Sequence, residues 1–154
     1  MPSRSRASPC PTYGWPVTDL ARLPEAATSW LGAISLIVPD YDDAIGFFCK
    51  GLGWTLCEDV AQGHKRWVTV QPPGGGCRLV LAQPADPKQN SAIGAQGGGR
   101  VWLFLHTDDF AADQARLVAA GAVFEEIPRD EPYGRVAVWR DPWGNRWDLI
   151  EPRP

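Results

Sequence analysis

The sequence predicts an α+β domain made of two tandem βαβββ modules. Three observations carry this prediction: many turn-forming residues, short apolar segments with the spacing of strands and helices, and an internal repeat. Of the 154 residues, 16 are glycine and 15 are proline, which exceeds average usage but stays below the level typical of disorder. A chain of this length forms one domain or two very small ones.

The first half reads as a strand, a helix and three further strands. Ala33 to Val38 is apolar and β-branched, and Pro39 ends it. Helical spacing of apolar residues over Tyr41 to Leu52 predicts a helix, with Asp40 as its N-cap and Gly53 just after its end. Three more strands are expected at about residues 54–58, 66–70 and 78–82.

The second half repeats this plan after a Gly-rich connector at residues 85–99. It reads as a strand over 101–107, a helix over 110–120 that Asp108-Asp109 begins and Gly121 ends, and strands at about 123–126, 135–139 and 146–150. A shift of 69 residues places Asp40 on Asp109, Tyr41 on Phe110 and Arg66 on Arg135, and a shift of 68 places Gln83-Pro84 on Glu151-Pro152. We therefore expect modules at 31–84 and 100–152, after a poorly ordered N-terminal tail at 1–29.

Charge and cysteine usage exclude several classes of protein. The net charge of −3, with no block of like charge, argues against nucleic acid and anionic membranes as partners. No apolar stretch is long enough to span a membrane, and no apolar segment of a secretory signal follows Arg4 and Arg6. The four scattered cysteines contain no CxxC pair, which favours reduced thiols and a cytoplasmic protein over a disulfide scaffold or zinc knuckle.

Two local motifs add a resemblance to a known superfamily. Residues 38–48 (VPDYDDAIGFF), followed by Leu52-Gly53-Trp54, open the first module, and residues 141–149 (DPWGNRWDL) close the second. In this order and within a repeat, the motifs resemble the vicinal oxygen chelate superfamily of glyoxalases, bleomycin-resistance proteins and extradiol dioxygenases. The resemblance covers about residues 31–152. It implies that each module curls its sheet into half of an open barrel around a central cavity.

Metal-dependent members of that superfamily place four ligands in the cavity. The resemblance puts these positions on Ala33, Val80 or its neighbour Leu79, Trp102 and Asp148. Apolar side chains offer no lone pair and the indole N–H is only a donor, so Asp148 alone could ligate. One carboxylate does not hold a divalent cation against water, and we expect no metal site and no cofactor.

Period-2 alternation predicts which side chains face the cavity. The expected ligand-binding residues are Ser35, Trp102, Phe104, His106, Tyr133, Arg135, Trp139, Arg146 and Asp148. A flat aromatic or amphipathic molecule could stack on Trp102 and Phe104 while Arg146 or His106 fixes a polar group. In the structural alternatives, Trp102 fills the vacated ligand space as core and His106 is an ordinary strand-end histidine.

Two functions from different classes follow, with a third beside them. The first is a metal-independent protein that binds a small molecule in a cavity shared between modules or between the subunits of a homodimer. The second is an enzyme, either a glyoxalase-like lyase or isomerase with Asp148 and His106 as catalytic acid and base, or a dioxygenase-like protein with a displaced metal. The third is a domain that mainly mediates dimer contacts. The sequence leaves the ligand unnamed.

Overall fold

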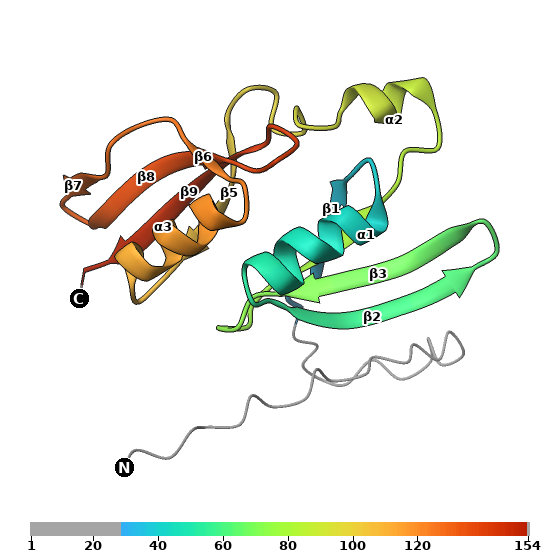
Figure 1. Cartoon of the computed structure of the whole chain (residues 1–154), viewed down its shortest axis with the longest axis horizontal. Coiled ribbons are helices and arrows are strands. Elements are labelled where there is room, and N and C mark those ends of the chain that lie inside the picture. The colour runs from blue at the N-terminus through green and yellow to red at the C-terminus, as the bar shows by residue number, and fades with distance from the viewer. Residues whose placement is uncertain (1–28, 154) are drawn as a thin grey trace, which may run out of the picture.

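The computed structural model describes residues 29–153, and the expected N-terminal tail falls almost wholly outside them. The chain forms two mixed sheets that lie side by side (Figure 1). Sheet 1 runs in the order β1 (Ala33–Ile37), β4 (Arg78–Ala82), β3 (Lys65–Gln71) and β2 (Thr55–Gln62). Sheet 2 runs β5 (Val101–His106), β9 (Arg146–Pro152), β8 (Gly134–Arg140) and β6 (Val123–Phe124), and β7 (Arg129–Glu131) also pairs with β8. In both sheets the first strand lies parallel to the last, which confirms the α+β fold with two βαβββ-like modules.

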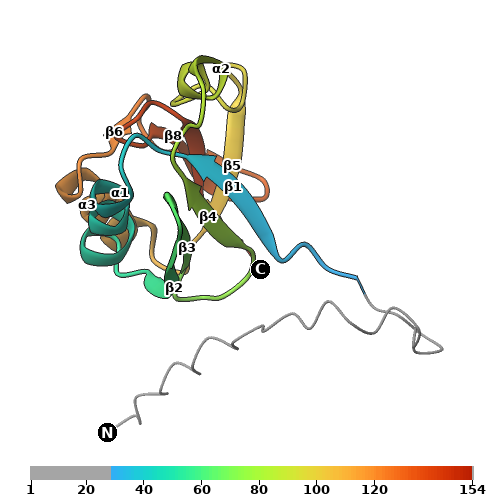
Figure 2. The same cartoon turned by 90° about the vertical axis from the view of Figure 1, so that its right-hand side faces the viewer.

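The two principal helices begin where the sequence predicts. The Asp40 carboxylate accepts hydrogen bonds from the Asp42 and Asp43 N–H groups at the start of α1 (Tyr41–Ile45). The Asp109 carboxylate accepts one from the Ala112 N–H at the start of α3 (Phe110–Ala119). Figure 2 shows α1 and α3 on the same side of the molecule.

The first helix differs from the expectation beyond Ile45. It continues as the π-helix η1 (Gly46–Gly51), and the Leu52 N–H bonds the Phe47 carbonyl five residues back. The wider turn of a π-helix lets two consecutive aromatic side chains, Phe47 and Phe48, face the core together. At its end, a Cβ on Gly51 would lie 2.7 Å from the Ala120 Cβ, so glycine here allows η1 to approach the end of α3.

A cluster of aromatic rings under the helices joins the two modules. Phe48 of η1 packs against Trp54, Trp143 and Trp147, with ring centroids 4.9–6.3 Å apart. Trp139 stacks on Trp147 with centroids at 5.0 Å. Three of the eight tryptophans, Trp54, Trp143 and Trp147, therefore pack across the interface between modules, and Trp139 supports Trp147 from within the second module.

The turn between β8 and β9 is built around the buried carboxylate of Asp141. Its Oδ1 accepts hydrogen bonds from the backbone N–H groups of Trp143, Gly144 and Asn145, and its Oδ2 accepts from the Asn145 amide and the Trp147 indole. Burial raises the pKa of Asp141, while the bonds from Asn145 and Trp147 act in the opposite direction. This carboxylate fixes the closing motif recognised in the sequence.

The connector between modules carries local structure of its own. Asp86 caps the short helix α2 (Pro87–Ser91), and turns follow up to Gly99. Gly94, at φ +72°, lies so close to the Trp143 carbonyl that a Cβ would clash with it. The connector therefore packs against the Asp141 turn.

Two sequence expectations concern cysteines and membrane spans. Cys49 and Cys77 carry free thiols, whereas Cys57 is disulfide-bonded, so the expectation of reduced thiols is not met at this residue. Within residues 29–153, no helix has the length and apolar character needed to cross a membrane.

Candidate functional site

Each sheet has one face that packs on the helices and one, here called the open face, that points away from them. In sheet 2, Leu103, Leu105, Trp147 and Leu149 pack into or against the core, so the alternating residues Phe104, His106 and Asp148 lie on the open face. The same alternation places Ser35 and Val80 on the open face of sheet 1. The predicted facing of β1, β5 from Phe104 onward, and β9 therefore agrees with the structure.

Asp148 occupies the centre of the open face of sheet 2. Its register partners are Phe104 on β5 and Val138 on β8, so apolar side chains flank the carboxylate on both sides. The Asp148 Oδ1 atom is buried and has no hydrogen-bond partner among the described residues. A buried acceptor without a donor costs free energy, so this oxygen is suited to receive a donor from a bound molecule.

Charged side chains surround Asp148, but they are paired with other carboxylates. Arg146 donates to both carboxylate oxygens of Glu125, its Nη2 lying 2.7 Å from Oε2. Arg129 binds Glu126 and, at 3.0 Å, Glu131. Neither arginine forms an ion pair with Asp148 in the described part of the chain.

The balance of these effects raises the pKa of Asp148. Burial is the main cause; the nearby Glu126 adds to it, and the positive charges of Arg129 and Arg146 oppose it. The carboxylate is therefore held in a setting that disfavours its charged form until a cation or a donor approaches.

Apolar and histidine side chains form the exposed surface around this carboxylate. Phe104 is 61% exposed, and His106, two residues further along β5, is also exposed. An exposed phenyl ring beside a carboxylate can stack on a flat ring while the acid meets its polar or cationic group.

Two of the expected ligand residues lie on the opposite face. Trp139 is fully buried against Trp147 under the helices, and the Arg135 guanidinium stacks over the Phe110 ring at 5.3 Å. The sequence misassigned these side chains because β8 is apolar at four consecutive positions, 136–139. Without an alternation of polar and apolar residues, the sequence did not show which side chains of β8 face the helices. On β3, Arg66, Val68 and Val70 also face the helices.

Trp102 and Tyr133, two further residues of the expected ligand site, lie outside the regular alternation of the strands. A bulge between Val101 and Leu103 breaks the alternation at Trp102, which is half-buried and packs against the core. Tyr133 is 55% exposed in the turn between β7 and β8.

The sequence did not single out Arg129 and Glu126 as neighbours of Asp148. No motif marks them: Glu126 follows β6, and Arg129 begins β7, a strand that the sequence did not predict. The 68-residue shift contained a signal, since it places Glu58 on Glu126 and Arg78 on Arg146.

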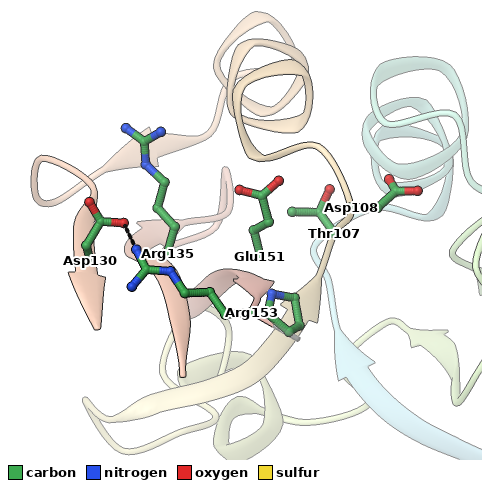
Figure 3. A pocket seen from close by; sticks show the side chains of 7 residues that line it. Thr107, Asp108, Asp130, Arg135, Glu151 and Arg153 are labelled. Atoms are coloured by element: carbon green, nitrogen blue, oxygen red, sulfur yellow. Dashed lines mark hydrogen bonds and ion pairs between the residues drawn. The ribbon is translucent and has the colours of Figure 1, made fainter. Parts of the chain in front are cut away.

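Two grooves lie at the ends of the sheets on the helix side. The larger, of about 640 Å³, is lined by Thr107, Asp108, Asp130, Arg135, Glu151, Pro152 and Arg153 (Figure 3). The smaller, of about 280 Å³, is lined by Tyr41, His64, Lys65, Gln83, Pro84 and Ala85. Their linings share repeat-related residues, so they are equivalent features of the two modules.

The donors present do not fit a metal ion at the superfamily's usual position. Ala33, Val80 and Trp102 supply no ligand atom, which leaves the Asp148 carboxylate. Among residues 29–153, no group of three or more His, Cys, Asp or Glu side chains could hold a metal ion elsewhere.

The fold and its closing motif belong to a known class of two-module proteins. Residues 30–149 match the Glyoxalase/Bleomycin resistance protein/Dioxygenase superfamily, and the chain belongs to this superfamily. An uncharacterized protein of Shewanella frigidimarina (strain NCIMB 400) is 48% identical over 121 residues, which cover 77% of this chain and 90% of the relative.

Solved structures of similar proteins include one with a stated ligand class. TnmS3, an antibiotic binding protein from Streptomyces sp. CB03234, is 34% identical, with a TM-score of 0.66 over 83% of this chain and 99% of TnmS3. UcmS2 is 28% identical, with a TM-score of 0.68 over 81% of this chain and 99% of UcmS2.

Proposed function

We propose that this protein binds a small aromatic or amphipathic molecule, carrying a cationic or hydrogen-bond-donating group, on the open face of sheet 2. The ligand ring would stack on Phe104 while its donor meets the Asp148 Oδ1. The similarity to an antibiotic binding protein supports a small-molecule ligand. The function requires no metal at this site.

The buried, unbonded Oδ1 of Asp148 is the observation that carries this proposal. Its nearest cations are already paired with Glu125, Glu126 and Glu131, so a bound cation would be the first partner of this oxygen. Hydrogen bonds to a charged group contribute about 1.5–3 kcal/mol, which corresponds to roughly 10- to 150-fold in affinity.

A homodimer is the second part of the proposal. In the single chain, large apolar side chains on both sheets are exposed: Leu56 (40%), Val60 (53%), Trp67 (39%) and Phe104 (61%). A second copy placed over these side chains would remove them from water and enclose the ligand. Sedimentation velocity over a wide range of concentrations tests this part: a dimer supports it, and a monomer throughout contradicts it.

Binding of a planar aromatic cation tests the ligand site. Ethidium should quench tryptophan fluorescence on binding, and Asp148→Asn should weaken its affinity by about 10-fold or more because the acceptor charge is lost. Phe104→Ala should weaken it through loss of the stacking surface. Asp43→Asn, at an exposed position in α1 on the helix side, is the matched control and should leave the affinity unchanged. Equal affinity for wild type and Asp148→Asn would contradict the proposal.

One observation favours an enzymatic alternative. The raised pKa of Asp148 suits a general acid, and His106 is exposed on the same face. If the protein turns over a carbonyl substrate, Asp148→Asn and His106→Ala should each abolish turnover while substrate still binds. Turnover that persists in both variants would exclude this pair as acid and base.

A further inference from the structure

The edge of β1 that faces away from β4 is filled by a side chain of the connector. The Gln96 carboxamide accepts a hydrogen bond from the Ile37 N–H at 2.6 Å and donates one to the Ser35 carbonyl at 3.2 Å. A residue of a parallel neighbouring strand makes this same pair of bonds. One primary amide therefore replaces a strand at this edge.

The repeat places the corresponding edge on β5, where no described residue fills it. The Val38 N–H bonds the Ala82 carbonyl, and its counterpart, the Thr107 N–H, bonds the Ile150 carbonyl. Backbone groups alternate in direction along a strand, so the preceding His106 N–H and the Phe104 carbonyl point away from β9. Among residues 29–153, neither group receives a partner from another strand or from a side chain.

We infer that this β5 edge is a binding subsite for a group presenting an N–H and a carbonyl oxygen on the same side, namely a primary carboxamide or a lactam. Gln96 shows within the same chain that such a group satisfies this backbone geometry. A trans secondary amide directs its N–H and oxygen to opposite sides and cannot make both bonds from one group.

The subsite adjoins the proposed ligand face and rests on that proposal for its biological role. The Phe104 residue supplies both the backbone carbonyl at the edge and the exposed ring on the open face. A ligand with an aromatic ring and a primary amide could use both at once. The edge bonds involve no atom of Asp148, so the two sites can be tested separately.

Amide hydrogen exchange with benzamide as the probe tests the subsite directly. In the free protein, the Ile37 N–H should exchange slowly because Gln96 protects it, and the His106 N–H should exchange fast. Saturating benzamide should slow hydrogen exchange at the His106 N–H by about 10-fold or more. Benzamide should also bind at least about 10-fold more tightly than N,N-dimethylbenzamide, which lacks the N–H groups. Asp148→Asn should leave benzamide binding intact, even if it abolishes ethidium binding.

Two variants sharpen this test. Gln96→Leu should expose the Ile37 N–H and create a second benzamide-protected amide at that position. His106→Pro removes the outward N–H at an edge that tolerates proline and should abolish benzamide binding, whereas His106→Ala should retain it. Unchanged exchange at His106 with benzamide, or equal affinity for the dimethyl compound, would overturn the inference. Protection of His106 in the free protein that grows with protein concentration would overturn it too, because a second copy would then fill the edge.

Discussion

The two modules share one backbone plan but treat their polar groups in opposite ways. At the centre of the open face of module 1, Val80 lies between the polar residues Ser35 and Thr69. At the equivalent place in module 2, Asp148 lies between Phe104 and Val138. The first arrangement is an apolar side chain with polar neighbours, and the second is a carboxylate with apolar neighbours.

Module 1 satisfies its polar groups internally. The Glu58 carboxylate accepts hydrogen bonds from the Trp67 indole, the Thr69 hydroxyl and Arg78. In module 2 the Asp148 Oδ1 and the β5 edge have no such partners among the described residues.

The repeated arginines show the same contrast. Arg66 stacks over the Tyr41 ring at 5.3 Å and also binds Asp42 and Asp59. Arg135 stacks over Phe110 at the same distance, but Ala111 occupies the position equivalent to Asp42, and no described carboxylate forms an ion pair with Arg135. The ion pairs of Arg66 in module 1 therefore have no counterpart at Arg135 among the described residues of module 2.

The largest effect is expected at the turns before the last strand of each module. Asp141→Ala should lower the free energy of unfolding by about 3 kcal/mol or more, because several buried donors lose their common acceptor. The matched change in module 1, Pro73→Ala, lies in an exposed turn and should shift stability by less than about 0.5 kcal/mol. Urea denaturation followed by tryptophan fluorescence measures both; similar losses would contradict the assignment of Asp141 as the main support of its turn.

Removing the acid from each open face should change stability with opposite signs. Glu58→Gln should lose about 1–2 kcal/mol, since the carboxylate serves three donors. Asp148→Asn should gain up to about 1 kcal/mol, because it removes a partly buried carboxylate whose Oδ1 has no bonded partner among the described residues. Equilibrium unfolding at neutral pH checks both values. A loss in Asp148→Asn would mean that this acid is structural.

The ionisation of Asp148 should contribute to the pH dependence of the free energy of unfolding. Its pKa is raised in the folded state, so folding favours the protonated form and this group opposes folding when ionised. The stability difference between Asp148→Asn and wild type should therefore be largest at neutral pH and shrink as pH falls through the raised pKa. Unfolding curves at a series of pH values measure it; a difference independent of pH would contradict the raised pKa.

The smallest effect is expected at the repeated arginines. Arg66→Met should lower the melting temperature more than Arg135→Met, because Arg66 loses two carboxylate partners besides its aromatic contact. Added salt should narrow this gap by screening the ion pairs of the wild type. Equal shifts at low salt would show that the ion pairs of Arg66 contribute nothing measurable.

The sequence predicted most of the fold and part of the candidate site. Both helix N-caps, the order of the main elements along the chain and the placement of Phe104, His106 and Asp148 on one face followed from local patterns. The π-helix at Gly46–Gly51, strand β7 and the bulge at Trp102 did not, because each depends on how neighbouring segments pack. The sequence did not predict that Arg135 and Trp139 face the helices, because the continuous apolar residues of β8 show no alternation with a period of two.

By itself, the sequence determined the duplicated scaffold and its helix caps, because repeats, caps and residue types are local properties that survive without coordinates. Only the tertiary structure decided which polar groups remain without partners. Whether Gln96 fills an edge, or whether the Asp148 oxygen finds a donor, depends on residues far apart in the chain that folding brings together. These partners distinguish module 1 from module 2, the module proposed to bind a ligand.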